Sequence, residues 1–183
     1  ELKVDLTDKQ FLQLCHDNSN LQFEWSATGE LIIMSPTGGN TSKSNADLVF
    51  QLQAWNRQGK LGEVFDSNGC FQLPNGSKRA ADVAWVCRER WDTLTLEEQE
   101  QFPPLCPDFV VELLSPSDSL QTTRKKMQEY LDNGIKLGWL INRKKQQVEV
   151  YRPDQPFEIL EKPQTISGEN VLLGFVLDLT TIW

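Results

Sequence analysis

The sequence predicts an α/β protein of mixed α+β character, in which a central mixed sheet is flanked by helices and hairpins lie toward both ends of the chain. Two observations indicate this class. The run 109–114 is almost entirely apolar, as in a strand that is buried on both faces. A helical segment then leads to a second apolar run at 137–141, a strand–helix–strand order that favours a parallel crossover.

The N-terminal third contributes a helix, a hairpin and a second helix. Thr7 is placed to cap the first helix. The hairpin pairs residues 23–25 with 31–34 around Thr28-Gly29. Asn40 or Thr41 is placed to cap the second helix, which carries apolar residues at spacings of three and four and ends at Gly59. We expect this long helix to cover one face of the sheet.

The middle and the end of the chain supply the remaining strands. Runs at 62–65 and 70–73 are strand-like, and Asn75-Gly76 is a tight-turn signal before the strand 81–87. An acidic helical stretch at 96–101 precedes the central strand, and the next helix runs from about Ser117 to Asn133. Residues 148–183 are typical of hairpins that finish the sheet.

Length and composition favour one domain over residues 1–183. The chain has 183 residues, of which 39% are hydrophobic and 24% charged, and it contains no internal repeat or Gly/Ser linker. No run approaches the roughly 20 apolar residues of a membrane helix, and residues 1–5 lack the pattern of a signal peptide. We therefore expect a cytoplasmic protein with no membrane association.

Charge and residue usage restrict the chemistry. The only histidine is His16, and this scarcity argues against Ser-His-Asp triads and histidine-based metal sites. The four cysteines stand far apart, without a Cys-x-x-Cys pair, so buried free thiols are expected. A net charge of −8 is unfavourable for binding a polyanion unless a local basic patch exists. Carboxylates and lysine must therefore carry any catalysis.

Asp82 and Glu112 are the candidate metal ligands. Glu112 interrupts a buried apolar strand, where an ionised carboxylate is costly unless a cation or hydrogen-bond donors meet it. Asp82 stands near the start of another apolar strand, so the two carboxylates could converge on Mg²⁺. The alternative interpretation gives Asp82 a turn role at a strand end and gives Glu112 a structural ion pair. Asp108 is excluded as the partner of Glu112, since four residues along one strand span about 13 Å.

Lys126 is the candidate cation. The position two residues after Glu112, on the same strand face, is Leu114 and supplies no charge. On the following helix Lys126 borders the apolar stripe that is centred on Met127, whereas Lys125 points nearly the opposite way. Lys126 could therefore lean over the sheet, although a lysine at such a boundary is also compatible with a solvated surface role.

These residues stand in motifs that resemble the Uma-type restriction endonucleases, a bacterial family assigned to the PD-(D/E)XK nuclease fold. The resemblance covers nearly the whole chain. It lies in four segments: 29–36 (GELIIMSP), 81–86 (ADVAWV), 107–117 (PDFVVELLSPS), and 126–141 with its Lys-x-x-x-Tyr, Gly134 and Trp139. The chain departs from the family at Ala81, where proline is usual, and at Asn142-Arg143, where Asp-Pro is common.

The resemblance implies a restriction-endonuclease-like sheet and an active-site set of Asp82, Glu112 and Lys126, with the lysine moved from the strand to the helix. It implies a Mg²⁺- or Mn²⁺-dependent endonuclease acting on DNA. The carbonyl of Leu113 is a possible further metal ligand. The candidate phosphate contacts are Lys78, Arg79 and Arg124, and the alternative for each of them is a solvated surface charge. Glu24 and Glu30 could join the acidic cluster, but ordinary hairpin faces explain them equally well.

Two further hypotheses concern assembly. We expect a homodimer, because the chain has six Trp and apolar C-terminal hairpins, and because an enzyme of this kind must address two DNA strands. The alternative to an enzyme is a catalytically inactive nuclease-like scaffold used for protein interaction or self-association, which the acidic composition favours.

Overall fold

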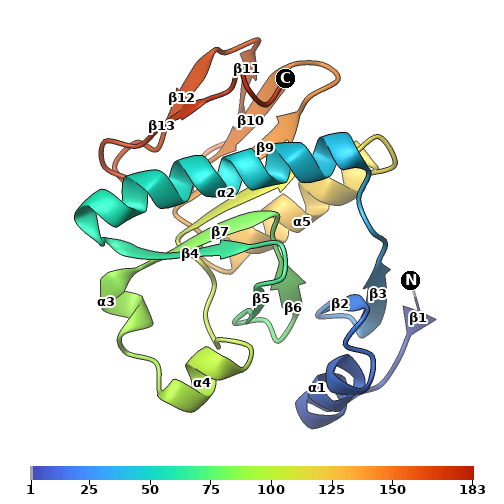
Figure 1. The fold of residues 1–183 in the computed structure, drawn as a ribbon. Coiled ribbons are helices and arrows are strands. Elements are labelled where there is room, and N and C mark those ends of the chain that lie inside the picture. The colour runs from blue at the N-terminus through green and yellow to red at the C-terminus, as the bar shows by residue number, and fades with distance from the viewer. Residues whose placement is uncertain (1) are drawn as a thin grey trace.

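The structure is a computed structural model that describes residues 2–183, so that of the expected domain only Glu1 lies outside the described residues. Its central element is a six-stranded sheet (Figure 1). In spatial order this sheet consists of β11 (Glu158–Glu161), β10 (Gln147–Tyr151), β9 (Leu137–Asn142), β8 (Phe109–Leu113), β7 (Val83–Cys87) and β4 (Gly62–Asp66). The β8–β9 pair is parallel and the other pairs are antiparallel, so the predicted mixed sheet is confirmed.

A smaller sheet and five helices complete the described part of the chain. The five-stranded sheet consists of β1 (Leu2–Lys3), β3 (Glu30–Met34), β2 (Gln22–Trp25), β6 (Lys78–Ala80) and β5 (Cys70–Gln72). The helices are α1 (Asp8–Asp17), α2 (Gly39–Gly59), α3 (Arg88–Trp91), α4 (Leu96–Glu100) and α5 (Leu120–Asp132). A C-terminal hairpin pairs β12 (Thr165–Ser167) with β13 (Val176–Asp178). The predicted hairpins near both ends are therefore present, but β12 and β13 form a sheet of their own and, contrary to the prediction, do not finish the six-stranded sheet.

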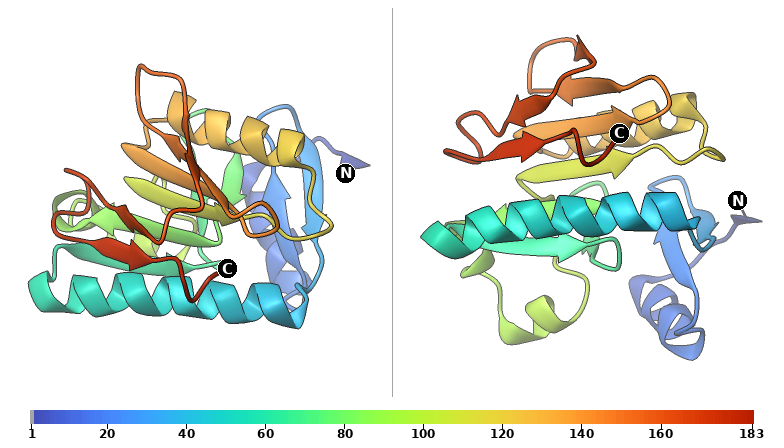
Figure 2. Two further views of the ribbon diagram at one scale, coloured as in Figure 1. Left: turned by 90° about the horizontal axis from the view of Figure 1, so that it is seen from above. Right: turned by 45° about the horizontal axis from the view of Figure 1, so that its top comes forward.

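Helices α2 and α5 cover opposite faces of the six-stranded sheet, as the left view of Figure 2 shows. Leu48 and Leu52 of α2 pack with Val111 in one core cluster. Met127 and Tyr130 of α5 pack in another, which contains the alternate residues of β7 and β8. Because successive side chains of a strand point to opposite faces, the even-numbered residues of β8 face α5. This alternation decides on which side Glu112 lies.

The predicted crossover is confirmed, with changes at the helix ends. Helix α5 connects the parallel strands β8 and β9, and it begins at Leu120 with Ser119 as its N-cap, later than the expected Ser117. Residues 115–118 instead form a turn that is closed by the Asp118 carboxylate, which accepts a hydrogen bond from the Ser115 N–H at 2.7 Å. Helix α2 has Gly38 as its N-cap, so the prediction of a cap at Asn40 or Thr41 was wrong.

The strand that carries Asp82 differs in a way that matters for the site. Asn75-Gly76 forms the predicted turn, with φ of 87° at Gly76, but it joins β5 to β6 in the smaller sheet. The chain then leaves this sheet at Ala81-Asp82 and enters the six-stranded sheet at Val83. Asp82 therefore lies at the junction between the two sheets, one residue before β7.

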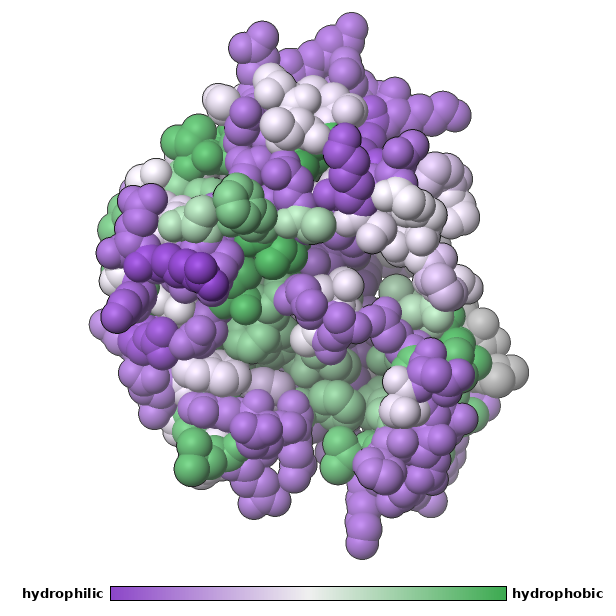
Figure 3. All heavy atoms as spheres, viewed as in Figure 1, coloured by the Kyte–Doolittle hydropathy of each residue, from purple (hydrophilic) through white to green (hydrophobic). Residues whose placement is uncertain are grey.

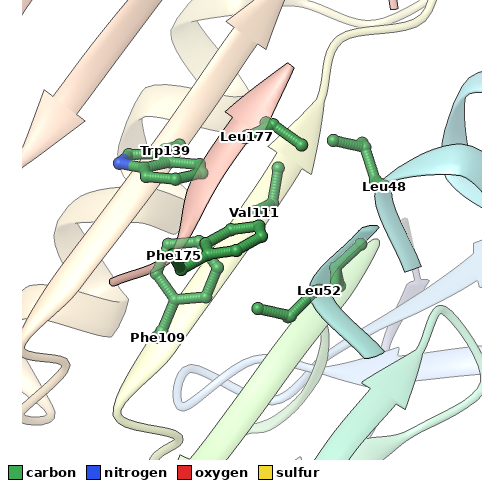
Figure 4. A pocket seen from close by; sticks show the side chains of 8 residues that line it. Leu48, Leu52, Phe109, Val111, Trp139, Phe175 and Leu177 are labelled. Carbon is green, nitrogen blue, oxygen red and sulfur yellow. The ribbon is translucent and has the colours of Figure 1, made fainter. Parts of the chain in front are cut away.

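A small cavity lies in the apolar interior. The cavity in Figure 4 is lined by Leu48, Leu52, Val83, Phe109, Val111, Trp139, Phe175 and Leu177, and its volume is ≈ 10 Å³. That is about the space that one water molecule needs, and the lining offers no polar surface to bind a water, so the cavity is a packing void. All four cysteines are free as predicted, but only Cys106 is buried.

The outer surface is mixed in character. On the face seen in Figure 3, hydrophobic side chains reach the surface near the middle, between hydrophilic regions. Exposed large apolar residues include Phe50, Leu96, Leu173 and Val176. Among the described residues, none of the helices combines the length and the apolar character needed to cross a membrane.

Candidate active site

Asp82 and Glu112 meet where β7 and β8 run side by side. The antiparallel register pairs Val83 with Val111, which places Asp82 beside Glu112 at the same end of the strand pair. Both residues are even-numbered, and so are Ala84 and Val110, which pack on the α5 side. The predicted convergence of two carboxylates from neighbouring strands is therefore present in the structure.

Two hydrogen bonds hold the Asp82 carboxylate in place. Its Oδ2 accepts a bond from the Leu113 backbone N–H at 2.7 Å, and its Oδ1 accepts a bond from Asn45 Nδ2 at 2.9 Å. Asn45 belongs to α2, so this helix also contributes to the site. Because the N–H and C=O groups of one strand residue point to the same side, the Leu113 carbonyl also faces the side of β8 on which Asp82 lies.

Lys126 reaches the same place from α5. Its Nζ lies 2.9 Å from Glu112 Oε1 and 2.7 Å from Glu24 Oε1. It also donates a hydrogen bond to the Ala80 carbonyl at 2.8 Å. The side chain is 14% exposed, which shows that Lys126 turns inward, as the position at the edge of the apolar stripe predicted. Lys125 is exposed.

Burial raises the pKa of both central carboxyl groups. The pKa of Glu112 rises to about 8 through burial, which Lys126 partly offsets and to which the nearby carboxylates of Asp82 and Glu24 add. Burial likewise raises the pKa of Asp82, although the Leu113 N–H and Lys126 counteract it. The carboxyl groups are thus held in an environment that disfavours their charged forms without an additional cation.

The surroundings of Lys126 and Glu24 favour the charged forms of these two groups, in contrast to those of Asp82 and Glu112. Burial alone would lower the pKa of Lys126, but the carboxylates of Glu112 and Glu24 outweigh it and hold the pKa well above its usual value. Burial opposes ionisation of Glu24, yet Lys126 and Arg79 keep the pKa of Glu24 below its usual value. Lys126 is therefore an ammonium group and Glu24 a carboxylate at neutral pH.

The residues present fit a hard divalent cation. Glu112 Oε1 is fully buried and, within residues 2–183, accepts no hydrogen bond of acceptable angle, in spite of its ion-pair distance to Lys126. Lys126 supplies one positive charge to two carboxylates, Glu112 and Glu24, so a further cation would stabilise ionised Asp82 and Glu112. No group of three His, Cys, Asp or Glu side chains in the described chain is arranged to hold a metal ion. A metal here would take two carboxylates, backbone carbonyl oxygen and water, as Mg²⁺ commonly does.

Asp108 has a structural role at the other end of β8. It is fully buried, and its Oδ2 accepts a hydrogen bond from the Cys87 N–H at 2.8 Å. Its Oδ1 forms ion pairs with Lys136 at 2.8 Å and Arg90 at 3.1 Å. These contacts tie the ends of β7, β8 and β9 together. Asp108 is thus separated from Glu112 by the length of the strand, as the sequence spacing indicated.

The three candidate phosphate contacts are all engaged with carboxylates. Lys78 is buried, with its Nζ at Asp8 and over the Trp25 ring at 4.9 Å from the centroid. The guanidinium groups of the other two are also paired: Arg79 contacts Glu24 at 3.1 Å and Glu129 at 2.6 Å, and Arg124 contacts Glu149 at 2.6 Å. This geometry does not favour them as phosphate contacts, because each would first have to leave its partner.

The sequence left Glu24 open, indicated Tyr130 only as part of a motif, and gave no sign of Asn45. Glu24 is 2% exposed, so the explanation of an ordinary hairpin face was not the right one. Asn45 gives no sequence signal beyond its place on the covering helix. Tyr130 of the Lys-x-x-x-Tyr motif lies with its ring 5.9 Å from Lys126 Nζ, and its buried hydroxyl has no hydrogen-bond partner among the described residues.

A mixed sheet covered by helices on both faces, with two acidic residues and a lysine at one end of its central strands, defines a protein of the restriction-endonuclease-like class. Comparison with known proteins agrees with this class. Residues 8–180 match the Uma2 family, which is described as "putative restriction endonuclease", and the chain belongs to that family.

A solved structure has the same fold. It is the crystal structure of a "putative nuclease belonging to DUF820" from Anabaena variabilis, with a TM-score of 0.80 and 22% sequence identity over 97% of each chain. At this identity the likeness shows the fold alone. Among curated proteins, none matches the sequence significantly.

Proposed function

We propose that this protein is a metal-dependent endonuclease that hydrolyses phosphodiester bonds of DNA. The observation that carries the proposal is the contact of Lys126 with Glu112, beside Asp82, at the end of the central strands. Two carboxylates and one cation at a strand end are what hydrolysis of a phosphodiester requires: anionic groups that bind a metal, and a positive group that faces the developing charge. Membership in a family described as restriction endonucleases supports the same reaction class.

Asp82, Glu112 and the Leu113 carbonyl are the groups that would hold Mg²⁺ or Mn²⁺. The raised pKa of Glu112 supports this assignment, since a bound cation would remove the cost of ionising a buried carboxyl group. When bound there, such a metal would supply an activated water molecule and would neutralise the negative charge that develops on the phosphate. Asn45 and the Leu113 N–H keep the Asp82 carboxylate fixed for this purpose.

Lys126 acts as an electrostatic group in this mechanism. Because neighbouring carboxylates hold its pKa well above the usual value, it does not accept a proton from water at neutral pH. It donates hydrogen bonds instead, so it orients the attacking water or the phosphate and stabilises the negative charge of the transition state. Among the roles open to a lysine here, proton abstraction is the one that its surroundings disfavour.

The partners proposed for this activity are DNA and a second copy of the chain. A nuclease that cuts both strands of a duplex needs two active sites, and a symmetric homodimer is the commonest way to supply them. Exposed apolar residues such as Phe50 and Leu173 offer surface for self-association.

Cleavage assays test the proposal. Supercoiled plasmid, linear duplex and single-stranded DNA are incubated with the purified protein in Mg²⁺ or Mn²⁺, with chelator as the blank. The wild type should cleave at least one substrate, and Asp82→Asn should abolish cleavage while the protein remains folded. If no DNA is cut with either metal, or if Asp82→Asn cuts as fast as wild type, the scaffold alternative replaces the enzyme.

A further inference from the structure

The ammonium group of Lys126 has to be placed by contacts outside its own helix. A lysine side chain is a flexible four-carbon stem that ends in a point charge, and its rotamer freedom opposes any fixed position. In the PD-(D/E)XK motif the lysine stands on the same strand as the acidic ligand, two residues after it, and the strand directs the lysine toward that ligand. Here Leu114 occupies that position, and Lys126 extends from α5 instead. Other groups must therefore hold its Nζ beside Glu112.

Glu24 is the strongest of these groups. Its Oε1 lies 2.7 Å from Lys126 Nζ, closer than Glu112 Oε1 at 2.9 Å. Glu24 comes from β2 of the smaller sheet, so its direction of approach differs from that of Glu112 on β8. The Ala80 carbonyl, next to Asp82 in the chain, accepts a third contact from the same ammonium at 2.8 Å. Three acceptors on three segments leave the ammonium little freedom to move.

Glu24 is itself fixed by groups that do not belong to the metal site. Its Oε1 accepts a hydrogen bond from the Ala80 N–H at 3.0 Å, and its Oε2 pairs with Arg79 at 3.1 Å. Arg79 is held in turn by Glu129. Each oxygen of Glu24 thus has a partner other than Lys126, whereas Glu112 Oε1 has its ion-pair contact with Lys126 and no hydrogen-bond partner among the described residues. This distribution of partners separates an anchoring carboxylate from a metal-binding one.

We propose that Glu24 is a positioning residue that fixes the ammonium group of Lys126 beside Glu112 and thereby makes the N-terminal hairpin part of the active site. The proposal rests on the proposed nuclease function for its consequence in catalysis. Its geometric part, the fixed ammonium, does not depend on that function. Glu24 acts through Lys126 and is assigned no contact with the substrate.

A double-mutant cycle tests the catalytic part. Glu24→Gln should lower kcat on DNA on the order of 100-fold, because a displacement of about 1 Å in a catalytic group has an effect of this size. KM for DNA and the Kd for Mn²⁺ should stay within a few fold of wild type. In the Lys126→Ala background the same change should have almost no further effect on kcat, since the residue through which Glu24 acts is gone. If Glu24→Gln lowered kcat by the same factor in the Lys126→Ala background as in the wild type, the proposal would be contradicted.

Glu169→Gln is the matched control. It makes the same chemical change in a carboxylate that pairs with an arginine, Arg152 at 2.6 Å, outside the ion pairs of Glu24, Arg79 and Glu129, so kcat should stay near the wild-type value. Glu24→Asp is the second variant if Glu24→Gln does not fold. It keeps the charge opposite Arg79 and shortens the reach to Lys126, so a partial loss of kcat is expected. Wild-type kcat in a folded Glu24 variant would overturn the proposal.

An NMR measurement on the metal-free protein tests the position of the Lys126 ammonium independently of DNA cleavage. A buried ammonium held by three negatively charged or carbonyl oxygens should give a proton–nitrogen NMR signal that is protected from solvent exchange. The loss of this signal in Lys126→Ala assigns it to Lys126. The signal should persist in Glu169→Gln and disappear in Glu24→Gln. An unchanged signal in Glu24→Gln would refute the positioning role. If the protein cleaves no DNA but the signal behaves as expected, the proposed function fails while the role of Glu24 at Lys126 stands.

Discussion

Lys126 illustrates how the surroundings of one side chain decide its chemistry. It lies between Glu24 and Glu112, and both ion pairs favour its charged form. A lysine in an apolar pocket would lose its proton more easily and could serve as a base. Here the protonated form is favoured, so the contribution to catalysis is electrostatic and depends on where the ammonium lies.

Removal of this ammonium should therefore slow the reaction without emptying the metal site. Lys126→Ala should cut the DNA cleavage rate on the order of 100-fold or more, the range of one acid–base or electrostatic group. The Kd for Mn²⁺ should remain close to wild type, because Lys126 is not a ligand. Lys125→Ala, a neighbouring exposed lysine, should be nearly neutral. Equal rates for Lys126→Ala and wild type would show that Lys126 is not part of the mechanism.

Glu112 should make the metal-free protein less stable as the pH rises. Its pKa is about 8 in the folded protein against an ordinary value of 4.5, so between these values the folded state binds more protons than the unfolded state. The free energy of unfolding then falls with rising pH across this interval, and the contribution is constant above it.

Glu112→Gln removes the titrating group and should flatten this dependence. Urea unfolding in chelator at pH values of about 5 and about 8 measures it. The loss of stability between the two pH values should be larger in wild type than in Glu112→Gln. The same pH dependence in both proteins would mean that Glu112 ionises normally in the fold.

At the scale of elements, the parts of the site that were predictable stand on the large sheet and its helix. A strand buried on both faces gives a continuous apolar run, so the carboxylate of Glu112 stood out in the sequence. The stripe on α5 likewise showed that Lys126 could turn inward. The pairing of Asp82 with Glu112 followed from two neighbouring strands, although the register that aligns them is visible only in the structure.

The contribution of the smaller sheet could not be predicted in the same way. Glu24 alternates with Phe23 and Trp25, a pattern that is typical of a strand with one solvated face. In the structure the strand face that carries Glu24 is turned toward Lys126 and Arg79 instead of solvent, so Glu24 is buried. Such burial depends on how two sheets are placed relative to each other. Local sequence periodicity carries no information on that placement.

Moving the positive charge from helix to strand tests whether the two elements serve one site. Leu114 packs with the α5 core cluster and stands two residues after Glu112, on the same strand face. Leu114→Lys in the Lys126→Ala background should restore part of the cleavage rate, because the new ammonium approaches the same carboxylates. Leu114→Met in that background is the control and should restore nothing. Equal rates in both double variants would place the two positions at different sites.

For the whole molecule, the homodimer remains a prediction. The monomer has a mass of 20.9 kDa, and large apolar side chains including Leu96 and Leu173 are exposed. Multi-angle light scattering at micromolar concentration should give about twice the monomer mass if two copies associate through such surface. A constant monomer mass at all concentrations, with and without DNA, would show that the homodimer prediction is wrong.

Metal binding at Asp82 and Glu112 underlies the proposed activity, and calorimetry measures this binding directly. Mn²⁺ is titrated into the wild type, Asp82→Asn and a control, Asp92→Asn, which removes one exposed carboxylate elsewhere and changes the net charge equally. Saturable binding is expected in the wild type and in Asp92→Asn, and loss of binding is expected in Asp82→Asn. Equal Mn²⁺ affinity in wild type and Asp82→Asn would contradict the assignment of Asp82 and Glu112 as the metal pair.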